Sequence, residues 1–433
     1  MKRLICIACF IVPLVGTAQP ELTLSDAIAI ALKNNYDIRL VAKDVAIAEN
    51  NVSIGNAGML PSISGDVSTA AGIQNTTQTL LSGETRAVRG NRTRSSAYGA
   101  SLDWTLFDGL QMFTRYEQLK ELRALGEANL KAAILATLYE VVSGYFDLVQ
   151  QGQLIKATQT ALDLSAFRYQ TAENRYQIGR ASKLEVLAAS VDLNTDTTNL
   201  LRQRDQYRSM QIRLNELLAR DVNTDFSVAD TIVIANDLNY ETLSQSAKEL
   251  NPTLQSAIVS HRISQLELKR IKGERYPVVS LSSAYTRSQS STELGFSTRS
   301  KNNGFNYGIS ASMNIFNGFM QRRNEQNAKF AVEAAEIEVD RVGQQIEAQL
   351  LAAYQTYLMN LELVRLEERN KDIAQENMDI TLEKFKLGSI APLEFREAQR
   401  NFVDASARFS TAQYQAKLAE ITLNQIAGTL KMD

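Results

Sequence analysis

The sequence of 433 residues predicts a mixed, mainly α-helical fold in which each chain supplies four β-strands and two long helical pairs. Three observations support this prediction. Several motifs occur twice in the same order, two pairs of segments alternate apolar and polar residues, and two proline-free segments keep helical spacing over an unusual length. The near-neutral charge of −2 gives no electrostatic reason to expect a nucleic-acid partner.

The first observation is an internal repeat. Leu106-Phe107-Asp108-Gly109 recurs as Ile315-Phe316-Asn317-Gly318, and Tyr176-Gln177-Ile178-Gly179 recurs at the same offset as Phe385-Lys386-Leu387-Gly388. The offset is much longer than the 20–50 residues of a solenoid unit. The sequence therefore predicts an internal duplication, in which two equivalent halves lie side by side.

The chain begins with the features of a secretory signal. Lys2 and Arg3 precede a short apolar segment at 4–15, and small residues at 16–18 form a cleavage site. The predicted organisation is therefore a signal peptide at 1–18, a first structural repeat at 19–220, a linker at 221–239 and a second structural repeat at 240–433. An acylated lipoprotein terminus at Cys9 is the weaker alternative, because Cys9 lies inside the apolar segment rather than after it.

Each repeat opens with a predicted helix of moderate length. The first starts at Leu24, with Ser25 or Asp26 as N-cap, and its counterpart runs from Tyr240 to about Lys272. Both are expected to end before a proline, Pro61 or Pro277, because the residue that precedes proline disfavours the helical conformation.

The alternating segments predict β-hairpins at 61–107 and 277–316. Ile63, Val67 and Tyr98 share an apolar face, and the opposite face carries Ser, Gly and Asp. Polar loops are expected at about 74–96 and 289–303. A soluble sandwich and a transmembrane barrel both show this alternation. The secretion signal and the aromatic residues near the segment ends favour the barrel.

The long helical segments predict two hairpins with glycine turns. The segment from Leu110 to Ile178 contains no proline, and Gly179 and Gly388 are expected to reverse the chain, with tips near 179 and 388. Four strands are too few to close a barrel, for which ~8 is the practical minimum in bacteria. A symmetric ring of three chains would supply twelve strands.

Taken in this order, the motifs resemble the TolC-type outer-membrane efflux family, over nearly the whole mature chain. The resemblance implies a homotrimer with a 12-stranded transmembrane β-barrel, continued by a long α-helical periplasmic barrel, in the Gram-negative outer membrane. It also implies a passive channel for efflux or type I secretion, working with a periplasmic adaptor (membrane fusion protein) and an inner-membrane pump of the RND or ABC type. A belt of smaller elements is expected around the helices.

The resemblance also implies functional residues. Glu394 and Glu397 match a carboxylate pair at the pore constriction, with Glu185 at the corresponding place in the first repeat. A ring of carboxylates in a narrow pore favours cations. The residues expected at the tip turns and in adaptor contact are Gly179, Arg180, Lys183, Gly388 and Ser389. The expected membrane-interface aromatics are Trp104, Tyr98, Phe107, Tyr307 and Phe316.

The sequence departs from the family pattern at the second tip. Phe385 occupies a position at which the family often has a tyrosine. Ile390 occupies a neighbouring position that is basic in the family. Because Phe385 has no hydroxyl group, the closed state is expected to depend more on packing.

An enzyme is not expected. The chain has a single histidine, its two cysteines lie in the predicted signal peptide, and it has no P-loop or Gly-rich dinucleotide motif. The sequence accordingly predicts no cofactor and no metal. A periplasmic coiled-coil adaptor or scaffold protein is the alternative, which would share the signal and the helices but not the repeated hairpins. The sequence leaves the exported substrate and the identity of the pump open.

Overall fold

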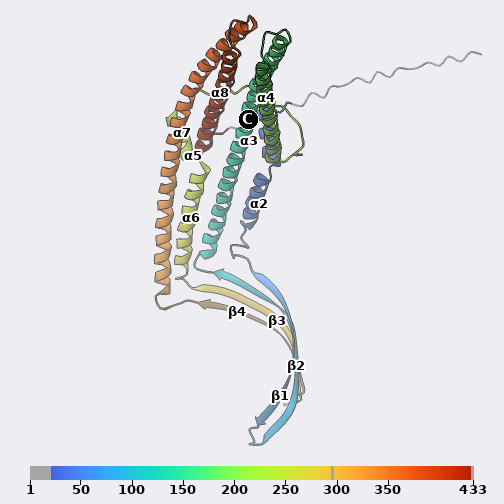
Figure 1. Cartoon of the computed structure of the whole chain (residues 1–433). Coiled ribbons are helices and arrows are strands. Elements are labelled where there is room, and N and C mark those ends of the chain that lie inside the picture. Colours follow the sequence, from blue (N-terminus) through green and yellow to red (C-terminus); the bar gives the residue numbers. More distant parts are fainter. Residues whose placement is uncertain (1–20, 294–296, 431–433) are drawn as a thin grey trace, which may run out of the picture. The chain divides into compact units, whose positions relative to one another are not determined.

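A computed structural model describes residues 21–293 and 297–430 (Figure 1). The predicted signal peptide lies outside the described residues. The first series of elements is α1 (Leu24–Asn34), α2 (Tyr36–Asn51), β1 (Ser62–Thr79), β2 (Thr85–Phe107), α3 (Gln111–Gln177) and α4 (Lys183–Leu217). The second series is α5 (Tyr240–Leu250), α6 (Pro252–Gly273), β3 (Val278–Thr292), β4 (Arg299–Ser312), α7 (Met320–Lys386) and α8 (Pro392–Ala427).

The chain divides into two compact units, and each draws on both halves of the sequence. The helical unit comprises the described residues up to Leu40, Lys131–Asn251 and the described residues from Gln344 onward. The sheet unit comprises Val41–Leu130 and Pro252–Gly343. The long helices α3 and α7 contribute residues to both units.

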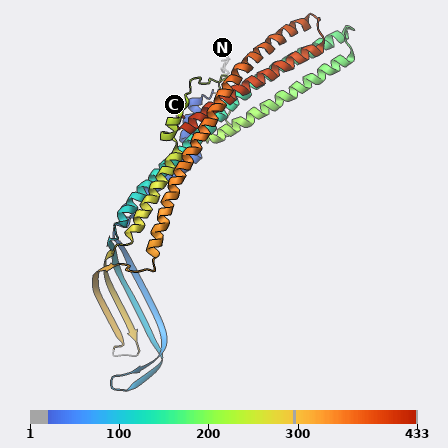
Figure 2. The same ribbon diagram turned by 90° about the vertical axis from the view of Figure 1, so that its left-hand side faces the viewer.

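The sheet unit contains one antiparallel sheet in the order β1-β2-β3-β4 (Figure 2). The two predicted hairpins pair with each other through β2 and β3, in a register that includes Tyr98↔Arg287 and Trp104↔Leu281. Partners across a ladder share one face of a sheet. The predicted alternation therefore extends over all four strands, and one face collects the apolar residues.

The predicted polar loops were wrong in extent. Strand β1 continues to Thr79 and β2 starts at Thr85, so most of the segment at 74–96 is strand. The second hairpin likewise pairs up to Ser291↔Arg299. The frequent threonines of these segments are β-branched and suit a pleated sheet, although the segments lack apolar alternation.

Hydrogen bonds and close backbone packing connect the sheet to the helices that adjoin it. Trp104 Nε1 donates to the carbonyl oxygen of Met59 at 2.9 Å, and Arg115 Nη1 donates to that of Ala57 at 3.0 Å. Gly109 has a φ of 73°, and a Cβ atom there would lie 2.2 Å from the carbonyl oxygen of Gly273. The repeated motif that ends in Gly109 thus terminates β2 and starts α3 at a position where only glycine fits.

The core of the helical unit lies among α1, α3, α4 and the linker. Leu138 and Leu148 of α3, Leu214 of α4 and Phe226 of the linker are almost completely buried. The linker also receives hydrogen bonds from outside the core, since Tyr357 Oη donates to the carbonyl oxygen of Ala235 at 2.5 Å. The predicted linker is therefore packed against the core through Phe226 and hydrogen-bonded to α7 through Ala235.

Each predicted first helix is two helices in the structure. Asn35 separates α1 from α2, and its Oδ1 accepts hydrogen bonds from the backbone amides of Asp37 and Ile38 at 2.9 and 3.2 Å. Pro252 starts α6, and the preceding residue has the extended conformation that proline favours. The N-cap of α1 is Thr23, whose hydroxyl oxygen accepts from the amide of Asp26, so the predicted cap at Ser25 or Asp26 was wrong.

Among the described residues, α3 is the one helix long and apolar enough to cross a membrane by length and composition. A core helix of a soluble protein meets the same criteria, and 44% of the most apolar window of α3 is buried inside the chain.

Candidate pore constriction and tip

The two helical hairpins of the helical unit reverse through the same backbone turn. Gly179 and Gly388 both have a φ of 74°. After α3, the amide of Arg180 donates to the carbonyl oxygen of Arg175 at 2.7 Å; after α7, the amide of Ser389 donates to that of Lys384 at 3.0 Å. This six-to-one hydrogen bond is the Schellman motif, which requires a left-handed residue that glycine adopts without strain.

The predicted tip residues are all exposed. Arg180, Lys183 and Ser389 lie within the reversals or immediately after them, beside the two glycines. The Lys183 ammonium lies 5.4 Å from the centre of the Tyr176 ring, and the Ser389 hydroxyl donates to the carbonyl oxygen of Lys384 at 3.0 Å. The tips therefore present exposed polar groups at turns closed by backbone hydrogen bonds.

The predicted constriction carboxylates lie near the start of the returning helices, Glu185 and Glu394 in the first turn and Glu397 in the second. Glu394 and Glu397 are both exposed on α8, and Glu397 pairs with Arg400 at 3.1 Å. Glu185 occupies the first turn of α4, where its amide donates to the Ser182 hydroxyl oxygen at 3.2 Å. Acidic residues in a first helical turn are stabilised by the helix dipole.

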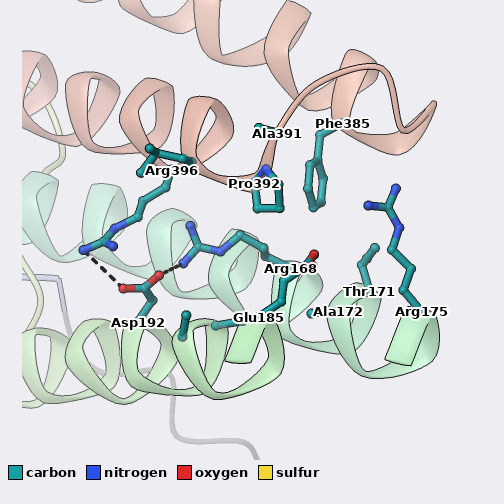
Figure 3. A pocket seen from close by; sticks show the side chains of 13 residues that line it. Arg168, Thr171, Ala172, Arg175, Glu185, Asp192, Phe385, Ala391, Pro392 and Arg396 are labelled. Atoms are coloured by element: carbon teal, nitrogen blue, oxygen red, sulfur yellow. Dashed lines mark hydrogen bonds and ion pairs between the residues drawn. The ribbon is translucent and has the colours of Figure 1, made fainter. Parts of the chain in front are cut away.

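One chain does not bring the three carboxylates together. Glu185 is half-buried and lines a cavity of about 320 Å³ between the two hairpins, whereas Glu394 and Glu397 do not line it (Figure 3). The side chains of Phe385, Pro392 and Arg396 reach into this cavity from α7 and α8 (Figure 3).

Sequence reasoning missed the polar cluster at this cavity. The Arg168 guanidinium contacts the Asp192 carboxylate at 2.5 Å, and Arg396 of the other hairpin contacts the second oxygen of Asp192 at 3.3 Å (Figure 3). The Arg168 side chain is 4% exposed. Burial lowers the pKa of Arg168, and the neighbouring Asp192 carboxylate opposes this effect.

A second polar group continues this cluster along the hairpin. Gln399 Nε2 of α8 donates to the carbonyl oxygen of Ala161 at 2.8 Å and to Ser165 Oγ at 2.9 Å, and the Ser165 hydroxyl donates to Asp196. The spacing of Asp192 and Asp196, four residues apart on one face of α4, was the available signal. The cluster ties α8 to the α3–α4 hairpin.

Phe385 is buried, with 2% of its surface exposed. Its ring stacks on Phe395 with the ring centres 4.9 Å apart, and the Arg175 guanidinium lies 5.7 Å from its centre. An aromatic stack of this kind contributes about 0.5–1.5 kcal/mol beyond area burial. The residue that departs from the family pattern therefore joins the two helices of its own hairpin by packing.

The predicted interface aromatics occupy the sheet unit. Tyr98, Trp104 and Tyr307 are exposed on its apolar face, whereas Phe107 is half-buried. Phe316 follows β4 and packs edge-to-face on Phe319, with ring centres 5.4 Å apart.

This combination of a four-stranded sheet with two long helical hairpins is the fold of outer-membrane channels. The chain superimposes on the Campylobacter jejuni CmeC outer membrane channel with a TM-score of 0.78 and 17% identity, covering 94% of this chain and 86% of CmeC. The open state of the Neisseria gonorrhoeae MtrE outer membrane channel gives a TM-score of 0.71 and 18% identity, covering 95% of this chain and 90% of MtrE. At these identities the likeness concerns the fold.

Sequence comparison places the chain within a family. The family model described as outer membrane efflux protein matches residues 27–220 and 243–429. The chain therefore belongs to the outer membrane efflux protein family, and the predicted resemblance is confirmed. The outer membrane efflux protein BepC of Brucella suis is 22% identical over 442 residues, which cover 100% of this chain and 91% of BepC. The protein is thus an outer-membrane efflux channel, as predicted.

Proposed function

We propose that three copies of this chain close a 12-stranded barrel in the outer membrane and continue as a passive helical conduit into the periplasm. The observation that carries this proposal is the open sheet. Within the described chain, β1 pairs only with β2 and β4 only with β3, so both edges of the sheet are unpaired. Unpaired edges cannot remain in a bilayer, because their backbone groups would lack hydrogen bonds.

The apolar face of the sheet supports membrane insertion. Val67, Phe305, Tyr307 and Ile309 are between 63% and 86% exposed in the single chain. Facing lipid would remove this surface from water, and closure of the ring would satisfy both edges.

The proposed partners are a periplasmic adaptor and an inner-membrane pump. Gly179, Arg180, Lys183, Gly388 and Ser389 would meet the adaptor, since all are exposed at or beside the two glycine turns. The family match favours a channel over the alternative of an adaptor or scaffold, because the matched segments cover both predicted repeats. The two matched segments also support the proposal of an internal duplication.

We assign the constriction to Glu394 and Glu397. Both are exposed, and their separation of three residues on α8 places them on one helix face. In a ring of three chains they would form two circles of negative charge. Glu185 would contribute less, because it lies at the cavity between the hairpins.

Disulfide crosslinking tests the ring. Both natural cysteines lie in the predicted signal peptide, so introduced cysteines would be the ones available. Thr69→Cys on β1 is combined in turn with Lys301→Cys, Asn303→Cys or Phe305→Cys on β4. Within one chain these edges are three strand spacings, about 14 Å, apart, which no disulfide spans. At least one pair should give crosslinked dimers and trimers after oxidation in membranes. Monomers in every combination would refute the ring, and single-cysteine variants are the controls.

A further inference from the structure

Between the ends joined to the helices and the register shift at Gln74/Thr76, the sheet sorts its charged residues by face. In the segments 62–74, 91–107, 278–292 and 299–312, the sequence contains five cations and two carboxylates. The carboxylates, Asp66 and Asp103, share the polar face with Gly99 and Ser282, their partners across the ladder. The cations all occupy the apolar face: Arg92, Arg94, Arg287, Arg299 and Lys301.

The cross-strand register defines this sorting. Ala71 pairs with Arg94, Arg94 with Ser291, and Ser291 with Arg299, so these four residues form one row across the sheet. The neighbouring row ends at Lys301, which pairs with Gln289. Because side chains alternate along a strand, these rows share a face with the row in which Tyr285 pairs with Phe305.

The cations lie at one end of the apolar face. A transmembrane strand needs ~9–11 residues. In β2, β3 and β4, counted from the end of the strand that is joined to a helix, this length reaches the row formed by Tyr98, Arg287 and Asn303. The other four cations lie beyond this row, toward the end of the sheet at which β1 turns into β2 (Figure 2). This end faces the exterior if the helices lie in the periplasm.

The five cations are all exposed, and within residues 21–293 and 297–430 none of them forms an ion pair. Arg92, Arg94 and Arg299 line one hollow of about 960 Å³, in which Glu293 is the single carboxylate. Arg94 and Arg299 stand two strand spacings, about 10 Å, apart. Several like charges on a surface that continues an apolar band attract anions at the level of a lipid headgroup.

We propose that this cation belt, formed by Arg92, Arg94, Arg287, Arg299 and Lys301, binds the phosphate groups of lipid headgroups in the outward-facing leaflet. The apolar rows would contact the acyl chains, and the row in which Tyr285 pairs with Phe305 would lie at the membrane interface. The guanidinium groups would contact the phosphates, which arginine binds bidentately. The inference rests on the proposed membrane insertion of this face of the sheet.

The test uses the purified full-length protein in neutral detergent, with a bisphosphorylated glucosamine glycolipid (lipid A) as probe. The apparent affinity is obtained from the rise in melting temperature during lipid titration. The phosphorylated lipid should raise the melting temperature of the unmodified protein. The same lipid without its phosphates, or inorganic phosphate at equal concentration, should raise it far less. An equal rise with either would overturn the proposal, in favour of acyl-chain binding or of free anion binding.

Variants locate the effect. Arg94→Gln with Arg299→Gln should weaken lipid binding about 30-fold, since each cation near a charged surface contributes a factor of roughly five. Arg86→Gln is the matched control, because Arg86 is an exposed arginine of the same strand whose guanidinium already meets Glu84 at 3.4 Å. Equal losses in the two variants would overturn the assignment.

A second pair of substitutions keeps the proposal testable if the double glutamine variant fails to assemble. Arg94→Lys with Arg299→Lys keeps both charges and should retain most of the affinity, so a complete loss there would also contradict the proposal. The oligomeric state is measured in the same samples. A monomer would refute the proposed ring, whereas a trimer without phosphate-dependent binding would refute only the cation belt.

Discussion

The two hairpin tips share a backbone but differ in what holds them. Gly179 and Gly388 have equal φ angles and close the same Schellman motif. The equivalent aromatic residues nevertheless differ, since Tyr176 is 43% exposed and Phe385 is 2% exposed. The first hairpin instead buries the ion pair between Arg168 and Asp192. A repeated turn therefore fixes chain reversal, while each copy acquires its own means of joining two helices.

The second sequence copy lacks this ion pair. At the constant offset that relates Phe107 to Phe316, Arg168 corresponds to Asn377 and Asp192 to Asn401. Phe385 stacks on Phe395 there instead. The ion pair and the aromatic stack thus join the two helices of their hairpins at different positions, since Phe385 and Phe395 correspond to Tyr176 and Val186. Four predictions test this comparison.

The largest effect is expected from the aromatic pair. Phe385→Ala should cost about 3–5 kcal/mol of local stability, because it removes a buried ring and leaves a cavity. Tyr176→Ala should cost under about 1 kcal/mol, because that ring is half in water and contacts a lysine. Hydrogen exchange of the tip amides measures both: at least a hundredfold acceleration is expected for the first variant and less than tenfold for the second. Equal acceleration would show that the tips are equivalent after all.

The ion pair should follow closely. Asp192→Asn leaves the buried Arg168 charge without its partner, which costs about 3–5 kcal/mol in comparable buried pairs. Arg396→Gln is the control, since its side chain is 58% exposed and its contact with Asp192 should contribute at most about 1 kcal/mol. The melting temperature of the detergent-purified protein should fall clearly for the first variant and barely for the second.

The double variant Arg168→Asn with Asp192→Asn tests the comparison itself. It gives the first hairpin the two asparagines of the second and removes the unpaired charge. It should therefore recover part of the stability lost in Asp192→Asn alone. A double variant less stable than the single variant would contradict the view that the charged pair and its neutral counterpart are interchangeable solutions.

The glycines should give smaller and similar effects. Ala at position 179 or 388 must adopt a positive φ, at a cost of about 1–2 kcal/mol. A Cβ atom at Gly388 would also approach Arg175 Nη2 to 3.1 Å, but this end of a flexible side chain can move. The rate of proteolysis at each tip measures the cost, and it should rise about equally in the two variants. A change confined to Gly388→Ala would mean that crowding, rather than backbone strain, determines the requirement for glycine.

The sequence predicted what depends on local periodicity. Alternation placed Tyr98 and Trp104 on the correct face of their strand, and Gly179 and Gly388 marked both reversals. It did not predict the strand extension to Thr79, because residues 74–79 are all Gln, Asn or Thr and give no apolar signal. The break at Asn35 was missed as well, since an asparagine that caps a following helix looks like one inside a helix.

The buried polar cluster near the tips could not be predicted from the sequence. Arg168 and Asp192 belong to different helices, and their contact depends on the register between α3 and α4. Arg396 comes from the other half of the chain. One sequence carries no direct information on such register, so the cluster is a product of tertiary packing. The carboxylates Glu394 and Glu397 were assigned from family resemblance and remain a prediction.

The smallest structural effect, but a distinct functional one, is expected from those carboxylates. Glu394→Gln with Glu397→Gln should change the melting temperature little, because both side chains are exposed and only Glu397 has a surface ion pair. It should instead lower the preference for cations in planar bilayers, measured as the reversal potential in a salt gradient. Glu185→Gln is the matched control in the first tip and should change selectivity less, since Glu185 lines the cavity between hairpins. Unchanged selectivity in the double variant would refute the assignment of the constriction to α8. A larger change for Glu185→Gln would indicate that the constriction lies in the first hairpin.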